Sequence, residues 1–309
     1  MIARVEALPA LTLGVAPRHW VFEPVLVVAV LMAGAAYLVG VHRVRTRGEQ
    51  WPVARTATFL VAGLGGFVVT SMSVLGAYHG RLFWAYALRL GLLTTVVPAL
   101  LAAGRPGTLL RAATRPRRTA FGGAVWRGVE SPLVAPLVVP LLFAWVLFTP
   151  VLGATLRHDL LDQAVTLLVL IISVVVLLPL VGDGAPATSL SIGVGVMVGI
   201  LELIIDAIPG LLVRLRTDLL AGDYWGTIHR PWGPPAIRDQ HIAGQVLWIL
   251  ADLIDLPFLA ILAVRWVRAD AREAAVIDRT LDEATTGGEE LLTPWWLTEQ
   301  RPGQRRRRP

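Results

Sequence analysis

Two pairs of acidic residues interrupt apolar stretches in the C-terminal half of the chain. Glu202 and Asp206 form the first pair, and Asp252 and Asp255 form the second, in an apolar run that ends near Arg265. An acid at bilayer depth is costly and normally faces protein or water instead of lipid. The spacing of each pair places both acids on roughly one helical face. These acids therefore indicate a polar pocket between helices, with the chemistry to hold a proton or a cation.

A basic residue, Arg89, lies in another apolar run, with Tyr86 three residues earlier on the same helical face. At 1.5 Å per residue, Arg89 and Asp206 lie roughly 10 Å below the predicted outer helix ends, and Asp252 and Glu202 roughly 14–16 Å below. These depths match, so we expect one shared polar core in which protons, water or a bound cation offset the excess negative charge. A single Arg–carboxylate pair that locks helices together is the alternative. The predicted core comprises Tyr86, Arg89, Glu202, Asp206, Asp252 and Asp255.

A further polar face begins at the apolar run that follows His158. Asp159, Asp162 and Thr166 share this face, where they either cap the start of a helix or help to bind a metal. Imidazole and carboxylate groups suit copper or zinc, and five of the six histidines fall in or near predicted outer loops. Single histidines at an interface are, however, more often structural. The candidate metal ligands are His79, His158, Asp159, Asp162 and His241.

The composition decides the class of protein that must position these residues. The chain has 309 residues, of which 55% are hydrophobic and only 16% charged, as in an integral membrane protein. The absence of cysteine excludes disulfides, cysteine-based zinc sites and thiol catalysis. No phosphate-binding glycine loop, His-Glu-x-x-His helix or serine nucleophile elbow is present. We therefore expect a protein that is not an enzyme and holds no organic cofactor.

The apolar runs predict an all-α bundle of about seven transmembrane helices, because each is close to the ~20 residues that cross a bilayer. The predicted spans are 24–41, 56–77, 82–103, 132–148, 160–181, 190–213 and 242–267. The chain then divides into a helical membrane domain, residues 1–268, and a cytoplasmic charged tail with short amphipathic segments, residues 269–309.

Arginine predicts the orientation, because inner loops of membrane proteins are enriched in basic residues. With the N-terminus outside and the C-terminus in the cytoplasm, 19 of the 28 arginines fall on inner segments and 8 on outer ones, leaving Arg89 in a span. This bias explains the basic charge without nucleic acid as a partner. The tail carries Trp295, Trp296 and the basic run 305–308, which either contact an anionic inner leaflet or lie in solvent.

Several short motifs carry a family resemblance. These motifs, in chain order, are Gln50-Trp51-Pro52, Phe148-Thr149-Pro150, Pro179-Leu180-Val181-Gly182 with Asp183, then Asp239, Gln240, Gly244 and Trp248, and finally Arg265-Trp266-Val267-Arg268 with Asp270, Arg272 and Glu273. In order and spacing they resemble the actinobacterial cytochrome c oxidase assembly proteins of the CtaG family. The chain looks like a divergent member, because Tyr86, Leu90, Thr166, Leu168, Glu202 and Asp206 mark the regions where the family usually carries intramembrane histidines.

The resemblance implies a plasma-membrane factor that binds subunits of cytochrome c oxidase and assists copper delivery at the outer face. Two other functions fit the same residues. One is a proton- or cation-coupled transporter that uses the intramembrane carboxylates. The other is a structural membrane subunit whose buried charges only fix the register of its helices.

Overall fold

The computed structural model describes residues 9–11, 19–114, 135–178 and 189–286, which form helices joined by loops and contain no β-strand. The predicted all-α fold is confirmed. The elements are α2 (Pro24–Thr46), α3 (Val53–Ala57), the π-helix η2 (Thr58–Leu64), α4 (Gly65–Met72), α5 (Val74–Tyr78), α6 (Phe83–Thr94), α7 (Val96–Ala103), α8 (Pro106–Thr114), α10 (Ala135–Phe148), α11 (Val151–Arg157), α12 (Asp159–Leu177), α13 (Ser189–Leu215), α14 (Gly222–Trp225) and α15 (Ala236–Thr286).

Within the described residues, five helical segments are long and apolar enough to cross a membrane, and a bent pair would make a sixth. The five are Pro24–Thr46, Val53–Tyr78, Phe83–Ala103, Asp159–Leu177 and Ile192–Leu215. The seventh predicted span lies in α15, which is not in this set. The count of seven and the orientation of the termini therefore stay predictions.

The bent pair consists of α10 and α11, which meet at an angle of 65°. The bend falls at Thr149-Pro150, where proline removes a backbone donor and breaks the regular helix. The hydroxyl of Thr149 donates to the carbonyl of Trp145 at 2.6 Å and accepts the amide of Val151 at 3.3 Å. This side chain thus supplies hydrogen bonds at the break.

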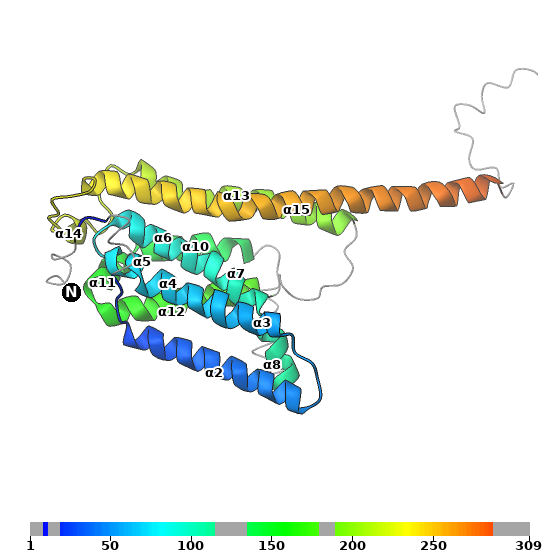
Figure 1. Cartoon of the computed structure of the whole chain (residues 1–309). Helices are drawn as coiled ribbons and strands as arrows, with labels where there is room; N and C mark the ends of the chain where they lie inside the picture. The colour runs from blue at the N-terminus through cyan, green and yellow to red at the C-terminus, as the bar shows by residue number, and fades with distance from the viewer. Residues whose placement is uncertain (1–8, 12–18, 115–134, 179–188, 287–309) are drawn as a thin grey trace, which may run out of the picture.

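The helices form a bundle with two distinct ends (Figure 1). α2 lies along one side and the α13–α15 pair along the opposite side, with α4, α6 and α7 between them. α5, α11 and α14 gather at one end, called here the α14 end, whereas α3 and α8 lie at the other, called the α8 end. α15 continues far beyond the bundle past the α8 end.

Close backbone contact holds α13 against α15. A Cβ atom built on Gly244 would lie 2.5 Å from the carbonyl oxygen of Gly210, and one built on Gly210 would lie 2.8 Å from that of Gly244. Only glycine at both positions allows this approach, which is a common packing device between membrane helices. Nearer the α8 end, a Cβ atom built on Gly199 would lie a tight 3.1 Å from Leu259, and one built on Gly195 would lie 3.5 Å from Leu262, an ordinary packing distance.

Aromatic side chains anchor the core at each end of the bundle. At the α14 end, the rings of Phe83 and Trp225 stack with centroids 5.3 Å apart. At the α8 end, Tyr37 stacks on Phe59 at 4.1 Å and donates a hydrogen bond to the carbonyl of Gly104 at 2.8 Å. The indole of Trp51 donates to the same tyrosine hydroxyl at 3.2 Å. Trp51 of the Gln-Trp-Pro motif therefore joins the loop after α2 to the core.

Candidate functional site

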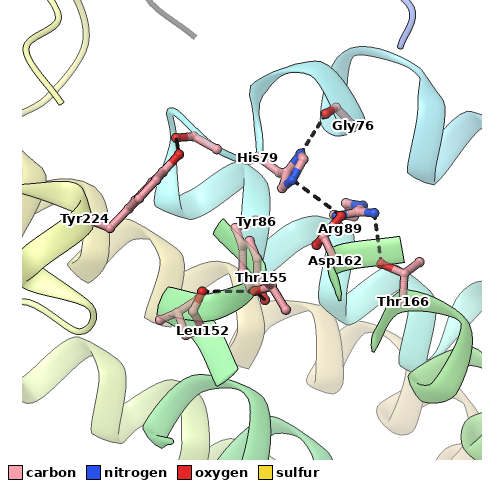
Figure 2. Close-up of polar contacts among 10 residues, drawn as sticks. Gly76, His79, Tyr86, Arg89, Leu152, Thr155, Asp162, Thr166 and Tyr224 are labelled. Carbon is pink, nitrogen blue, oxygen red and sulfur yellow. Dashed lines mark hydrogen bonds and ion pairs between the residues drawn. The ribbon is translucent and has the colours of Figure 1, made fainter. Parts of the chain in front are cut away.

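A buried ion pair between α6 and α12 forms the polar centre of the bundle (Figure 2). One terminal nitrogen of Arg89, Nη1, donates to both carboxylate oxygens of Asp162 at 2.9 and 3.1 Å, and Nη2 donates to the hydroxyl of Thr166 at 3.0 Å. Arg89 is 4% exposed and Asp162 is 7% exposed. Asp162 and Thr166 lie four residues apart on one face of α12, so a single helix turn supplies both acceptors.

His79 extends this cluster from the turn that follows α5 (Figure 2). Its Nε2 lies 3.6 Å from a carboxylate oxygen of Asp162, and its Nδ1 lies 2.7 Å from the carbonyl oxygen of Gly76. A carbonyl can only accept, so Nδ1 carries the proton and Nε2 does not when the ring is neutral. Burial and the Arg89 guanidinium lower the pKa of His79, against the opposing effect of Asp162. The neutral ring is therefore favoured.

Tyr86 and Thr155 lie beside the ion pair. Their hydroxyls are 3.3 Å apart, and that of Thr155 also donates to the carbonyl of Leu152 at 2.9 Å. A cavity of about 20 Å³ lies between Tyr86, Arg89 and Asp162. This volume suits roughly one water molecule. The arrangement can hold a charge pair and one water in a closed interior.

The residues predicted to share a polar core with Arg89 lie on α6, α13 and α15. The hydrogen bonds described for Arg89 go to α12, where Asp162 completes an Arg–carboxylate pair that joins two helices, which is the alternative that the sequence left open. The shared core with the acids of α13 and α15 stays a prediction. Asp206 is buried on α13 and Glu202 is partly buried four residues before it. Asp252 is partly buried on α15, while the side chain of Asp255 lies outside the part of the chain that the structure describes.

The sequence placed Asp162 among metal ligands or helix-capping acids instead of beside Arg89. Its spacing from Thr166 did indicate a polar face that descends into the bundle. The sequence does not show which helices pair, because Asp162 and Thr166 lie 73 and 77 positions from Arg89 along the chain. A carboxylate one turn inside a predicted span, with a guanidinium in another, is the signal that could have linked them.

The predicted metal ligands do not converge in the described residues, where no group of three or more histidine or acidic side chains could hold a metal ion. His79 and Asp162 lie together, but Arg89 already binds that carboxylate. The side chains of His158 and Asp159 are exposed at the start of α12. His241 bonds through Nε2 to the carbonyl of Arg216 at 3.0 Å. These donors do not fit a copper centre, and copper delivery stays a prediction.

The family-motif residues instead fasten α15 to its neighbours. The carboxylate of Asp239 accepts the backbone amides of Phe83 and Trp84 at 3.0 and 3.2 Å, and pairs with Arg230 at 2.7 Å. It thereby caps α6, whose own preceding residue, Leu82, has no side-chain acceptor. The sequence identified Asp239 as a marker but gave no reason for it.

Gln240 makes the equivalent connection to the end of α13 and the loop that follows it. Its side-chain oxygen accepts the amide of Leu220 at 2.8 Å, and its nitrogen donates to the carbonyl of Asp218 at 3.0 Å and to that of Val213 in α13 at 3.5 Å. The side chain is fully buried. The next motif position, Gly244, forms the close contact with α13, whereas the side chain of Trp248 is 40% exposed. Asp239, Gln240 and Gly244 therefore define how α6, α13 and α15 meet.

A pocket of about 580 Å³ opens at the α14 end above these connections. The stacked rings of Phe83 and Trp225 form part of its wall, and Arg230, Asp239 and the exposed His229 also line it. The segment 231–236 contributes three prolines to the lining. The pocket thus combines a rigid aromatic wall with a buried ion pair, and Asp239 belongs to both the pocket and the α6 cap.

Residues 35–269 match the family model of the cytochrome c oxidase caa3 assembly factor (Caa3_CtaG). The chain belongs to this family. The match extends from α2 into α15, so it contains the buried ion pair, the α6 cap and the residues that line the pocket. The family resemblance inferred from the motifs is confirmed.

Three mycobacterial proteins are similar to this chain over 277 residues. An uncharacterized protein of Mycobacterium leprae is 25% identical, and uncharacterized proteins of Mycobacterium bovis and Mycobacterium tuberculosis are each 26% identical. Each similarity covers 85% of this chain but 42% of the relative. The chain therefore spans less than half the length of these relatives. No solved structure matches it.

Proposed function

We propose that this protein is a plasma-membrane assembly factor for cytochrome c oxidase, with the α14 end outside the cell and the α8 end in the cytoplasm. The observation that carries the proposal is the family match over residues 35–269, which includes most of the helical bundle and its polar centre. The arginine bias supports this orientation, because the basic loop after α2 and the basic stretches around α8 and beyond α15 then face the cytoplasm.

In this proposal, the pocket at the α14 end receives a subunit of the oxidase. Aromatic residues and arginine are the side chains most often found at the energetic centre of protein interfaces. Arg230 is such a residue, and Asp239 holds it in place beside the exposed His229. Trp225, which is only 4% exposed, stacks on Phe83 and supports the wall from behind. A wall that is already ordered loses little conformational freedom when a partner binds.

In this proposal, the ion pair between Arg89 and Asp162 does not contact the oxidase subunit and affects the pocket only through α6. It joins α6 to α12, and α6 begins with Phe83 in the pocket wall. The pair therefore positions the pocket instead of moving a proton or a cation. The alternative, an ion-coupled transporter, needs a polar path, whereas the cavity beside the pair has room for about one water. No copper step is part of the proposal.

The proposed function predicts that loss of the gene lowers the a-type haem band in reduced-minus-oxidised spectra of membranes, and that the intact gene restores it. The variant His229→Glu should restore the band only weakly, because it places a negative charge on the exposed side of the pocket. Immunoblots with an epitope tag would establish that the variant is present in membranes at the normal amount.

Thr227→Glu is the matched control, since it adds the same charge at an exposed position two residues away that does not line the pocket. This control should restore the band fully. An unchanged a-type band in the deletion strain would refute the assembly function. Equal restoration by the two variants would instead refute the pocket as the docking site while leaving the assembly function intact.

A further inference from the structure

A second hollow in the bundle is a groove between α2 and α12, with a volume of about 380 Å³. Ala33 of α2 and Ile171 of α12 lie on its two sides, and Phe67 of α4 and Leu101 of α7 form its floor. Pro106 and other residues of α8 close the groove at the α8 end. Ile171 is 58% exposed, so this side of the groove opens outward from the bundle.

The lining determines what the groove can hold. All its lining residues are apolar or glycine. Buried water needs several polar partners, and an apolar cavity of this kind excludes it. Four of the segments that form the groove are long and apolar enough to cross a membrane, Pro24–Thr46, Val53–Tyr78, Phe83–Ala103 and Asp159–Leu177. A hydrocarbon chain is therefore the ligand that matches both the lining and its surroundings.

Arginine side chains stand at the α8 end of this groove. Arg111 donates through Nε to the carbonyl of Gly107 at 3.2 Å, and its Nη2 would lie 4.0 Å from a Cβ atom built on that glycine. Gly107 itself lines the groove. Arg47, at the end of α2, donates to the carbonyl of Ala112 in α8 at 2.7 Å. The guanidinium of Arg111 is thus held beside a residue that lines the groove, and that of Arg47 contacts the same helix, α8.

This combination is the chemistry of a phospholipid, with a hydrocarbon chain at one end and a phosphate at the other. Guanidinium groups bind phosphate through charge-assisted hydrogen bonds. We propose that the groove holds one acyl chain of an anionic phospholipid whose phosphate lies on Arg111, with Arg47 adding positive charge nearby. The inference does not depend on the proposed role in oxidase assembly.

The test uses the full-length protein exchanged into nanodiscs of phosphatidylglycerol and phosphatidylcholine, followed by native mass spectrometry of the lipid retained after detergent extraction. The protein should retain phosphatidylglycerol in preference to phosphatidylcholine. Arg111→Gln should lower retention of phosphatidylglycerol about tenfold, because it removes a hydrogen bond to a charged group. Arg111 is exposed, so this change leaves the core packing unaltered. Ala33→Leu should lower retention of both lipids, because it fills the groove.

Two matched controls complete the experiment. Arg43→Gln removes one exposed positive charge from the same end of α2, and Ala36→Leu enlarges an exposed residue of α2 that does not line the groove. Both should retain lipid like the unchanged protein. Equal retention by Arg111→Gln and Arg43→Gln, or by Ala33→Leu and Ala36→Leu, would overturn the proposal, as would retention of the two lipids without preference.

Discussion

The ion pair of Arg89 and Asp162 is costly to desolvate, and it fixes how two helices face each other. Both charges leave water, and close contact with hydrogen bonds to the terminal nitrogens of Arg89 offsets part of that desolvation, although its Nε is buried without a hydrogen-bond partner in the described residues. Asp162 accepts two hydrogen bonds from Nη1, and Thr166 accepts one from Nη2. Removing one partner would leave the other charge buried and uncompensated. The pair is therefore a strong constraint on which faces of α6 and α12 meet.

We expect Asp162→Asn to lower the free energy of unfolding by about 3–5 kcal/mol, the usual cost of stranding one buried charge. Thermal unfolding of the purified protein in detergent measures this loss. Asp159→Asn is the matched control, because that carboxylate is exposed on the same helix, and it should change stability by no more than about 0.5 kcal/mol. Equal effects of the two variants would contradict the structural role of Asp162.

The double variant Arg89→Met, Asp162→Leu separates the structural role from a chemical one. Apolar replacement of a whole buried ion pair is often neutral or stabilising, so its unfolding temperature should exceed that of Asp162→Asn. If the pair only positions helices, the double variant should also restore the a-type haem band in a deletion strain. A stable double variant without that band would show that the charges themselves take part in function.

Helix contacts decide how the pocket at the α14 end is assembled. α15 meets α13 through Gly210 and Gly244, and it meets α6 through the cap that Asp239 provides. All these contacts lie in the part of α15 nearest the α14 end. Residues of this single helix therefore fasten it to both neighbours, and three of them, Asp239, Gln240 and Gly244, belong to one family motif.

Gly244→Ala should push α13 away from α15, because its new Cβ atom would meet backbone atoms at 2.5–2.6 Å that cannot rotate aside. Overpacking of this kind typically costs about 1–3 kcal/mol, measurable as a lower unfolding temperature. Gly195→Ala is the control on the same pair of helices, since its Cβ atom would lie 3.5 Å from Leu262. A similar loss in both variants would mean that the Gly210–Gly244 contact has no special role.

The molecule consists of a packed bundle and a helix that leaves it. From residue 270 to 282 every described side chain of α15 is exposed, and the family match ends at residue 269. α15 nonetheless continues without a break across the predicted domain boundary at 268. Helix-favouring alanine, arginine and glutamate in this stretch account for the continuation. The extension is thus a feature outside the shared family bundle.

A chain that ends after Ala269 should insert into membranes and unfold at nearly the same temperature as the full chain, because the exposed extension contributes little packing. We expect a change within about 0.5 kcal/mol, measured by thermal unfolding in the same detergent. A large loss of stability or of folded yield would show that residues beyond 269 pack on the bundle.

The sequence alone was sufficient for the class of the protein. Long apolar runs without strand alternation indicated membrane helices, and local motifs such as Asp239-Gln240 identified the family. These properties depend on composition and on spacing over a few residues, which the chain carries directly. Proline favours the helix break at Thr149-Pro150, because it has no amide to donate, but Pro140 and Pro209 lie inside continuous helices. Proline alone therefore does not decide where a helix breaks.

The partners of the polar residues depended on helix packing. Arg89 pairs with Asp162 and Asp239 caps α6, and the members of each pair are separated by 73 and at least 155 positions. Spacing along a helix predicts a depth for Arg89 but not its neighbour, since helices at equal depth can be arranged in several ways around a bundle. Close packing selects one arrangement, because each buried charge and each helix end needs a partner within hydrogen-bonding distance.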